Sequence, residues 1–191
     1  MGIIPIITEL TPRGDRTTDV YSYLLQNRIV FVDAPIDDDL ASNIVAQLIF
    51  LDAQKSDADI YMYINSGGGG VESGLSILDM MKFIKCDIST IAIGKAYSMA
   101  SVLLSSGTPG KRLAFRHASI MIHQVKSLSP YSQAADIIIQ ARHTEAVNDE
   151  LLGILARNTG KTIEQIYRDA DRDNFFTARE AVEYGLIDAI I

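Results

Sequence analysis

The residues best suited to acyl-transfer chemistry are one serine and one histidine, each at the end of a predicted strand. Ser98 follows a strand and a glycine, and His123 ends the apolar run IMIH. A serine hydroxyl becomes a good nucleophile when an imidazole removes its proton, and the imidazole in turn needs a carboxylate to orient it. Asp169, Asp171 and Asp173 are the nearest downstream carboxylates, and spacing does not choose among them. Ser98 could equally cap the helix that follows it, since the G-x-S-x-G pattern is absent.

Four consecutive glycines, Gly67–Gly70, follow another strand. Ordering them costs much backbone entropy, so the position requires bare backbone. The P-loop pattern fails because no Lys-Ser/Thr follows, and no acidic residue supports a dinucleotide fingerprint. An oxyanion hole at a strand-to-helix turn and a simple tight turn both remain.

Composition excludes several other classes. The 191 residues carry a net charge of −7, which disfavours nucleic-acid binding. The single cysteine, Cys86, excludes an internal disulfide, and the scattered histidines form no metal motif, so we expect no metal and no cofactor. No apolar run could span a membrane and no signal peptide is apparent, which indicates a cytoplasmic protein. The mean hydropathy of +0.14 favours buried subunit interfaces.

The periodicity of the chain predicts an α/β domain. Residues 8–19 are polar and indicate a mobile loop. Gly94 indicates a turn, and residues 124–133 indicate a second loop or an irregular arm. Strands are expected at 28–32, 60–65, 87–93 and 119–123. Helices are expected at 19–27, 38–55, 71–84, 98–105 and 134–158, with two capping boxes, Thr162/Gln165 and Thr177/Glu180, starting two more.

Several ordered motifs give the chain a resemblance to the ClpP family, the proteolytic subunits of the ATP-dependent Clp protease. The matching segments span nearly the whole chain and include RGDRTTDVYSYLL, DIYMYINSGGGG, DISTIAIGKAYSMAS, IMIHQ and DRDNFFTAREAVEYGLID. The resemblance implies a serine endopeptidase with Ser98, His123 and Asp173 as its triad. It also implies that the backbone N–H groups of Gly69 and Met99 form the oxyanion hole.

The resemblance also implies a fold and an assembly. The fold would be a crotonase-like spiral of ββα units in a single domain, residues 1–191. An N-terminal axial loop would cover about 1–18, a head about 19–123 and 159–191, and a protruding handle about 124–158. Two stacked heptamers would form a tetradecameric chamber that hydrolyses unfolded polypeptides.

An AAA+ unfoldase of the ClpX, ClpA or ClpC type would feed this chamber. Asp171 and Arg172 would make contacts between the two rings. Apolar residues would form the docking site for the unfoldase: Tyr61, Tyr63, Phe83 and Leu113, with Ile91 and Ile93 as candidates that could equally be core residues.

The chain departs from the family pattern at three places within its sequence. Gly67 stands where the family has proline, Tyr97 replaces a small residue beside the serine, and SLSPYSQ replaces a glycine-rich turn. These departures motivate an alternative, a weakly active or regulatory subunit in mixed rings with a paralogue. An acyl-CoA enzyme on the same fold is a third hypothesis, supported only by analogy.

Overall fold

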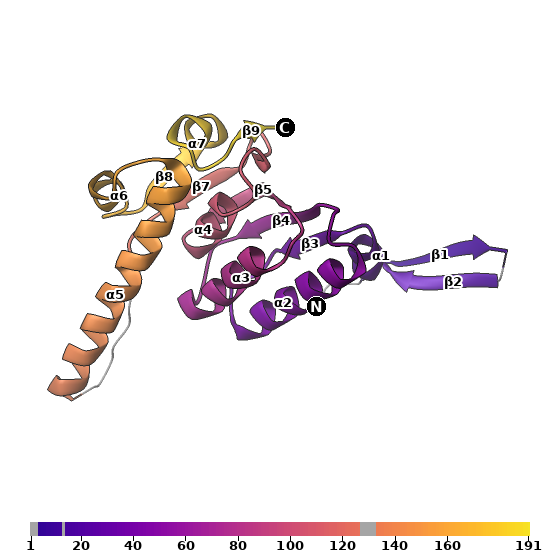
Figure 1. Ribbon diagram of the computed structural model, residues 1–191, viewed down its shortest axis with the longest axis horizontal. Helices are drawn as coiled ribbons and strands as arrows, with labels where there is room; N and C mark the ends of the chain where they lie inside the picture. The colour runs from indigo at the N-terminus through magenta and orange to yellow at the C-terminus, as the bar shows by residue number, and fades with distance from the viewer. Residues whose placement is uncertain (1–3, 13, 127–132) are drawn as a thin grey trace.

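The chain folds around a mostly parallel sheet. The computed structural model describes residues 4–12, 14–126 and 133–191, and its main sheet has the strand order β3-β4-β5-β6-β9, with β7 beside β5 and β8 beside β7 (Figure 1). All pairs in this sheet are parallel except β7 with β8. The strands are β3 (Ile29–Val32), β4 (Ile60–Ser66), β5 (Ile88–Tyr97), β6 (Arg112–Ala114), β7 (Ser119–Ile122), β8 (Asn174–Thr177) and β9 (Ala189–Ile190).

Seven helices occur among the described residues, and their positions confirm the predicted α/β class. The helices are α1 (Val20–Gln26), α2 (Asp38–Gln54), α3 (Val71–Phe83), α4 (Met99–Ser105), α5 (Ala134–Thr159), α6 (Ile163–Asp169) and α7 (Ala178–Tyr184). Helices α2, α3 and α4 contact one another in sequence order. In α2 the buried side chains are Ala41, Ile44, Leu48 and Leu51, which is the spacing of one helical face. Both predicted capping boxes are present, at Thr162 and Thr177.

The prediction that a strand at 87–93 is followed by a turn at Gly94 is wrong. Strand β5 continues through Gly94 to Tyr97, with a shift of register against β4 between Ile64 and Ser66. Gly94 has φ +75°, and a Cβ there would lie 2.8 Å from the Asn65 side-chain oxygen. The irregularity lets one strand pair first with β6 and then with β7, which carries the chain to Ser98.

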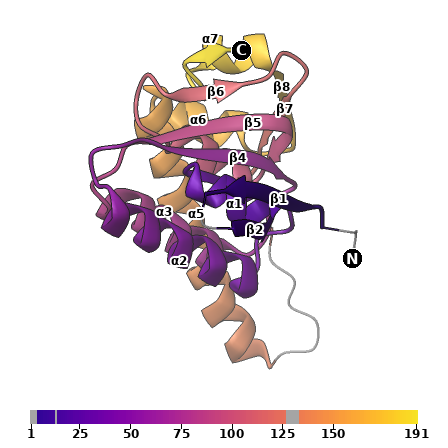
Figure 2. The same ribbon diagram turned by 90° about the vertical axis from the view of Figure 1, so that its right-hand side faces the viewer.

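The prediction of a mobile loop over residues 8–19 is also wrong where the structure describes it. Strands β1 (Ile6–Thr11) and β2 (Gly14–Asp19) form an antiparallel hairpin that projects away from the main sheet in Figure 1 and lies in front of it in Figure 2. The side chains of β2 are mostly exposed, so the segment lacks the hydrophobic alternation that identifies a half-buried strand.

Helix α5 extends well beyond the sheet at its N-terminal end (Figure 1). Its buried side chains, Leu151, Leu152, Ile154 and Leu155, all lie in its C-terminal half. Ile137, Ile138 and Ile139, near its start, are 47%, 54% and 64% exposed. Among the described helices, including this longest one, we find none with the length and apolar character needed to cross a membrane. The altered turn SLSPYSQ lies almost wholly outside the described residues.

Candidate active site

Ser98 occupies a strained turn between β5 and α4. Its backbone has φ +55° and ψ −126°, and only one other non-glycine residue among those described, Arg28, has a positive φ. Such a conformation costs about 1–3 kcal/mol and is common at functional sites. The Ser98 N–H donates to the Met121 carbonyl of β7 at 2.9 Å, and the Ser98 carbonyl accepts from Ser101 Oγ at 2.7 Å. The Ser98 side chain makes no capping hydrogen bond to α4, so the capping interpretation is wrong.

The glycine loop packs directly against this turn. Gly68 has φ +90°, and a Cβ there would lie 2.7 Å from the Tyr97 carbonyl oxygen and 2.8 Å from Ser98 Cβ. Hydrogen bonds tie the loop to the segment before α2: Ile36 N–H donates to the Gly68 carbonyl at 2.9 Å, and Gly70 N–H donates to the Ile36 carbonyl at 2.7 Å. The loop is therefore held on two sides without the proline that Gly67 replaces.

Two backbone N–H groups near Ser98 have no acceptor. Among the described residues, the structure gives no hydrogen bond from the N–H of Gly69 or of Met99. Gly69 and Met99 line the same pocket as Ser98 and His123. An unpaired pair of N–H groups beside a nucleophile can stabilise an oxyanion.

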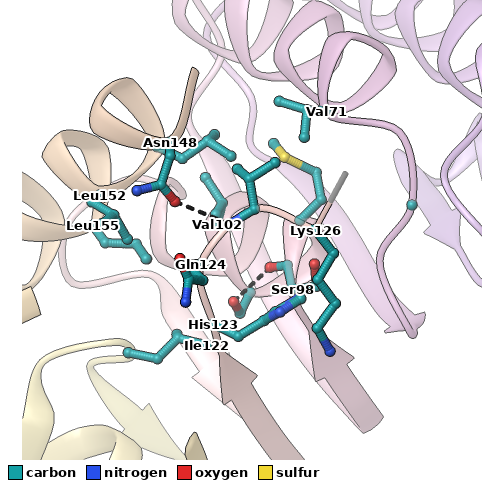
Figure 3. A pocket seen from close by; sticks show the side chains of 15 residues that line it. Val71, Ser98, Val102, Ile122, His123, Gln124, Lys126, Asn148, Leu152 and Leu155 are labelled. Carbon is teal, nitrogen blue, oxygen red and sulfur yellow. Dashed lines mark hydrogen bonds between the residues drawn. The ribbon is translucent and has the colours of Figure 1, made fainter. Parts of the chain in front are cut away.

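His123 follows β7 and lies beside Ser98 at the lining of this pocket (Figure 3). Its side chain is 9% exposed, and its Nδ1 is buried without a hydrogen-bond partner. Burial lowers the pKa of His123 below its usual 6.5, the Lys126 charge lowers the pKa further, and the Asp173 charge opposes both. A neutral imidazole at neutral pH can accept a proton. The two other histidines, His117 and His143, are exposed as predicted.

The antiparallel pairing of β7 with β8 brings Asp173 next to His123. Ile122 pairs with Asn174, so the residues that follow and precede them, His123 and Asp173, are neighbours. Asp173 Oδ1 lies 3.6 Å from His123 Nδ1, beyond hydrogen-bonding distance.

The other two candidate aspartates have different neighbours. Asp169 accepts a hydrogen bond from the Tyr184 hydroxyl at 2.7 Å. Asp171 is exposed and lies 3.6 Å from Arg172 Nη1. Proximity to His123 therefore favours Asp173 among the three.

Sequence reasoning missed Lys126. Its Nζ lies 3.0 Å from the Asp173 oxygen that faces His123, and this hydrogen bond is the main cause of the lowered pKa of Asp173. A lysine and an aspartate 47 positions apart show no local pattern, and only the β7–β8 pairing brings them together.

A pocket lined by both polar and apolar side chains adjoins the serine. Its volume is about 110 Å³. The apolar side chains around it come from four parts of the chain: Val71, Met99, Val102, Ile122, Val125, Leu151, Leu152 and Leu155. The Tyr97 ring does not line it and instead packs edge-on against Phe175, with ring centroids 5.4 Å apart. The replacement of a small residue by Tyr97 next to the serine therefore does not put the tyrosine ring into this pocket.

The residues predicted to dock an unfoldase lie partly in one row across the sheet. Tyr63 of β4 pairs with Ile91 of β5, which pairs with Leu113 of β6. Ile91 is 3% exposed and belongs to the interior, whereas Tyr61 and Ile93 are 43% and 42% exposed. Phe83, the last residue of α3, is 82% exposed.

Comparison with known families agrees with these observations. A family model described as Clp protease matches residues 12–191. This match includes the turn at Ser98, the glycine loop, and the β7 and β8 segments that hold His123 and Asp173. The chain therefore belongs to the Clp protease family.

Proposed function

We propose that this Clp-family protease is a serine endopeptidase that uses Ser98, His123 and Asp173. The observation that carries the proposal is the strained Ser98 turn, which shares one pocket with His123 and with the unpaired N–H groups of Gly69 and Met99. Serine peptidase chemistry requires this combination of nucleophile, base and oxyanion donors.

In this mechanism Ser98 Oγ attacks the peptide carbonyl carbon while His123 takes the serine proton. His123 then returns the proton to the leaving amine, and water hydrolyses the acyl-enzyme by the same route. The N–H groups of Gly69 and Met99 bind the oxyanion. Asp173 orients His123 and stabilises the imidazolium, which requires the 3.6 Å separation between them to shorten.

The apolar side chains that line part of the pocket beside Ser98 support a preference for an apolar side chain on the acyl side of the cleaved bond. Its lining residues from α4 and α5 are uncharged, and the one cation among its described lining residues, Lys126, comes from the segment after β7. A basic substrate side chain would lose its hydration there without an anionic partner and would also face the Lys126 charge.

The chamber, the handle and the unfoldase remain part of the proposal. Family membership favours an oligomer that works with an AAA+ unfoldase. Exposed isoleucines near the start of α5 support a handle at about 124–158 that buries them between two heptamers. Exposed Tyr61 and Phe83 support a docking surface for the unfoldase, and Tyr63 and Leu113 beside them are half-buried. Asp171 and Arg172 are exposed enough to make the proposed contacts between rings.

The test is intact-mass labelling of the purified protein with a fluorophosphonate. We expect one adduct per chain in wild type and in Ser76→Ala, a control on the exposed surface of α3, and none in Ser98→Ala. Hydrolysis of an unstructured peptide should follow the same pattern. Labelling or hydrolysis that survives in Ser98→Ala would refute the assignment of the nucleophile. Sedimentation of all three proteins would test the tetradecamer separately.

A further inference from the structure

Lys126 holds the carboxylate that His123 needs. Lys126 Nζ lies 3.0 Å from Asp173 Oδ1, and His123 Nδ1 lies 3.6 Å from the same oxygen. Hydrogen bonds between nitrogen and oxygen span about 2.7–3.2 Å. Asp173 is therefore bonded to Lys126 and not to His123.

This arrangement leaves His123 incomplete as a base. Its Nδ1 is the only buried side-chain nitrogen or oxygen among the described residues that lacks a partner. A buried polar atom without a partner costs free energy, so closing the gap to Asp173 would favour the folded site. The same hydrogen bond would fix the tautomer with Nε2 free to accept the serine proton.

The Lys126–Asp173 ion pair, which keeps Asp173 away from His123, lies at the surface. The side chains of Lys126 and Asp173 are 67% and 45% exposed. Exposed ion pairs contribute little to stability, because water solvates both partners when they separate. Lys126 can thus release Asp173 without breaking any of the core.

Few other charges face this position. Asp171, Arg172, Lys126 and Asp173 surround His123 on its solvent side, and Arg172 lies beside Asp171 at 3.6 Å. On the other side, the residues of α3, α4 and α5 that line the Ser98 pocket are uncharged. Glu72 of α3 and His143 of α5 line a neighbouring cavity with Lys126, and they lie 3.6 Å from each other. Lys126 is therefore the cation that competes directly for the Asp173 oxygen.

We propose that Lys126 is a positioning residue that competes with His123 for Asp173, so that the Ser98–His123 pair works efficiently only when Lys126 releases this carboxylate. The proposal rests on the proposed function, because it assumes that His123 is the base. In the resting site His123 would then work without its Asp173 partner, although all three triad residues are present.

The test compares Lys126→Met, which removes the charge and keeps the chain length, with Lys126→Arg, which keeps the charge. Lys55→Met is the matched control, since Lys55 is exposed at the end of α2 and its side chain makes no ion pair among the described residues. All variants would be assayed as the assembled full-length chain with a fluorogenic peptide, and Ser98→Ala would give the background.

We expect kcat to rise about two- to fivefold in Lys126→Met, which is what loss of one competing exposed ion pair is worth. Lys126→Arg and Lys55→Met should remain near wild type. The acidic limb of the kcat/KM profile should move to higher pH in Lys126→Met, because the pKa of His123 rises when a nearby cation is removed and Asp173 is free to accept a hydrogen bond from His123 Nδ1–H. An unchanged or lower kcat in Lys126→Met would overturn the proposal.

A second measurement does not depend on activity. Exchange of the imidazole Cε1 hydrogen for deuterium, read by mass spectrometry of peptides, reports the pKa of each histidine, and His117 and His143 serve as internal references. In a Ser98→Ala background, the His123 midpoint should rise with Lys126→Met and stay with Lys126→Arg. An unmoved midpoint would overturn the proposal. If instead Ser98→Ala kept full hydrolysis, the proposed function would fail. The exchange data would still show whether Lys126 competes with His123 for the Asp173 carboxylate.

Discussion

Replacing Gly68 with alanine should disable the site while a neighbouring glycine tolerates the same change. At Gly68 the added Cβ would stand 2.7 Å from the Tyr97 carbonyl oxygen and 2.8 Å from Ser98 Cβ, with the backbone at φ +90°. At Gly67 nothing lies within 4 Å of the added Cβ, and φ is not in the left-handed range. Both variants introduce the same methyl group. They differ in whether this group meets the turn at Tyr97 and Ser98 and in whether the backbone has a positive φ.

The size of the effect follows from the distances. A carbon–oxygen contact normally needs about 3.3 Å, so the loop and the Ser98 turn must separate by about 0.6 Å or more. The Gly69 N–H is carried on the displaced loop, and a misplacement approaching 1 Å costs about 10²-fold in rate. That loss corresponds to about 2.7 kcal/mol of transition-state stabilisation. The strained φ and the overpacking together should lower the free energy of unfolding by roughly 2–5 kcal/mol.

The assay is peptide hydrolysis, with kcat and KM determined separately, alongside thermal unfolding. For Gly68→Ala we expect kcat to fall about 10²-fold with a small change in KM, because the oxyanion exists only after attack. Gly67→Ala should keep wild-type kcat and should be as stable as wild type or more stable, by about 0.4–1 kcal/mol, since alanine lowers the entropy of the unfolded chain.

Two results would refute this reasoning. If Gly68→Ala kept wild-type kcat, the loop would not need its close approach to Ser98. If Gly67→Ala lost as much activity as Gly68→Ala, flexibility of the whole loop would matter and the contact with Tyr97 would not.

Three further predictions concern the base, the pocket and the packing. Because burial lowers the pKa of His123, the acidic limb of wild-type kcat/KM should have its midpoint below pH 6.5, with activity lost as pH falls through it; a midpoint above 6.5 in a pH–rate profile would contradict this. Tyr97→Ala should cost about 0.5–1.5 kcal/mol of stability through the lost Phe175 contact and leave kcat near wild type, and a large gain in activity would show that Tyr97 does obstruct the pocket. Arg112→Met should lower the free energy of unfolding by about 3 kcal/mol, because it leaves the half-buried Asp188 carboxylate without its main partner; unchanged denaturant unfolding would disprove that role.

Periodic segments could be predicted from the sequence alone. Helix α2 and strand β4 lie within one or two residues of their predicted ranges, because each buries one regularly spaced set of apolar side chains. The capping boxes at Thr162 and Thr177 marked the starts of α6 and α7, since a capping box is a local interaction within four residues.

Segments whose conformation depends on distant partners could not be predicted in this way. The hairpin β1–β2 is held by backbone pairing and has exposed side chains, so its hydropathy resembles that of a loop. Strand β5 continues past Gly94 because β7 pairs with its second half, and this partner lies more than twenty residues away. The short strands β6, β8 and β9 were missed, since β6 and β9 have only three and two residues and β8 has only two apolar side chains. The four-residue strands β3 and β7 were predicted because nearly all of their residues are apolar.

The candidate site divides along the same line. The sequence by itself identified Ser98, His123 and the glycine loop, because their residue types and their places at strand ends already indicate the chemistry. Spacing along the chain did not choose among Asp169, Asp171 and Asp173, and Asp173 was favoured only through the family resemblance. The tertiary structure places Asp173 beside His123, and only it revealed Lys126 on the same carboxylate. The physical reason is that electrostatic interactions depend on separation in space, and the β7–β8 pairing brings together charges that lie 47 positions apart in the chain.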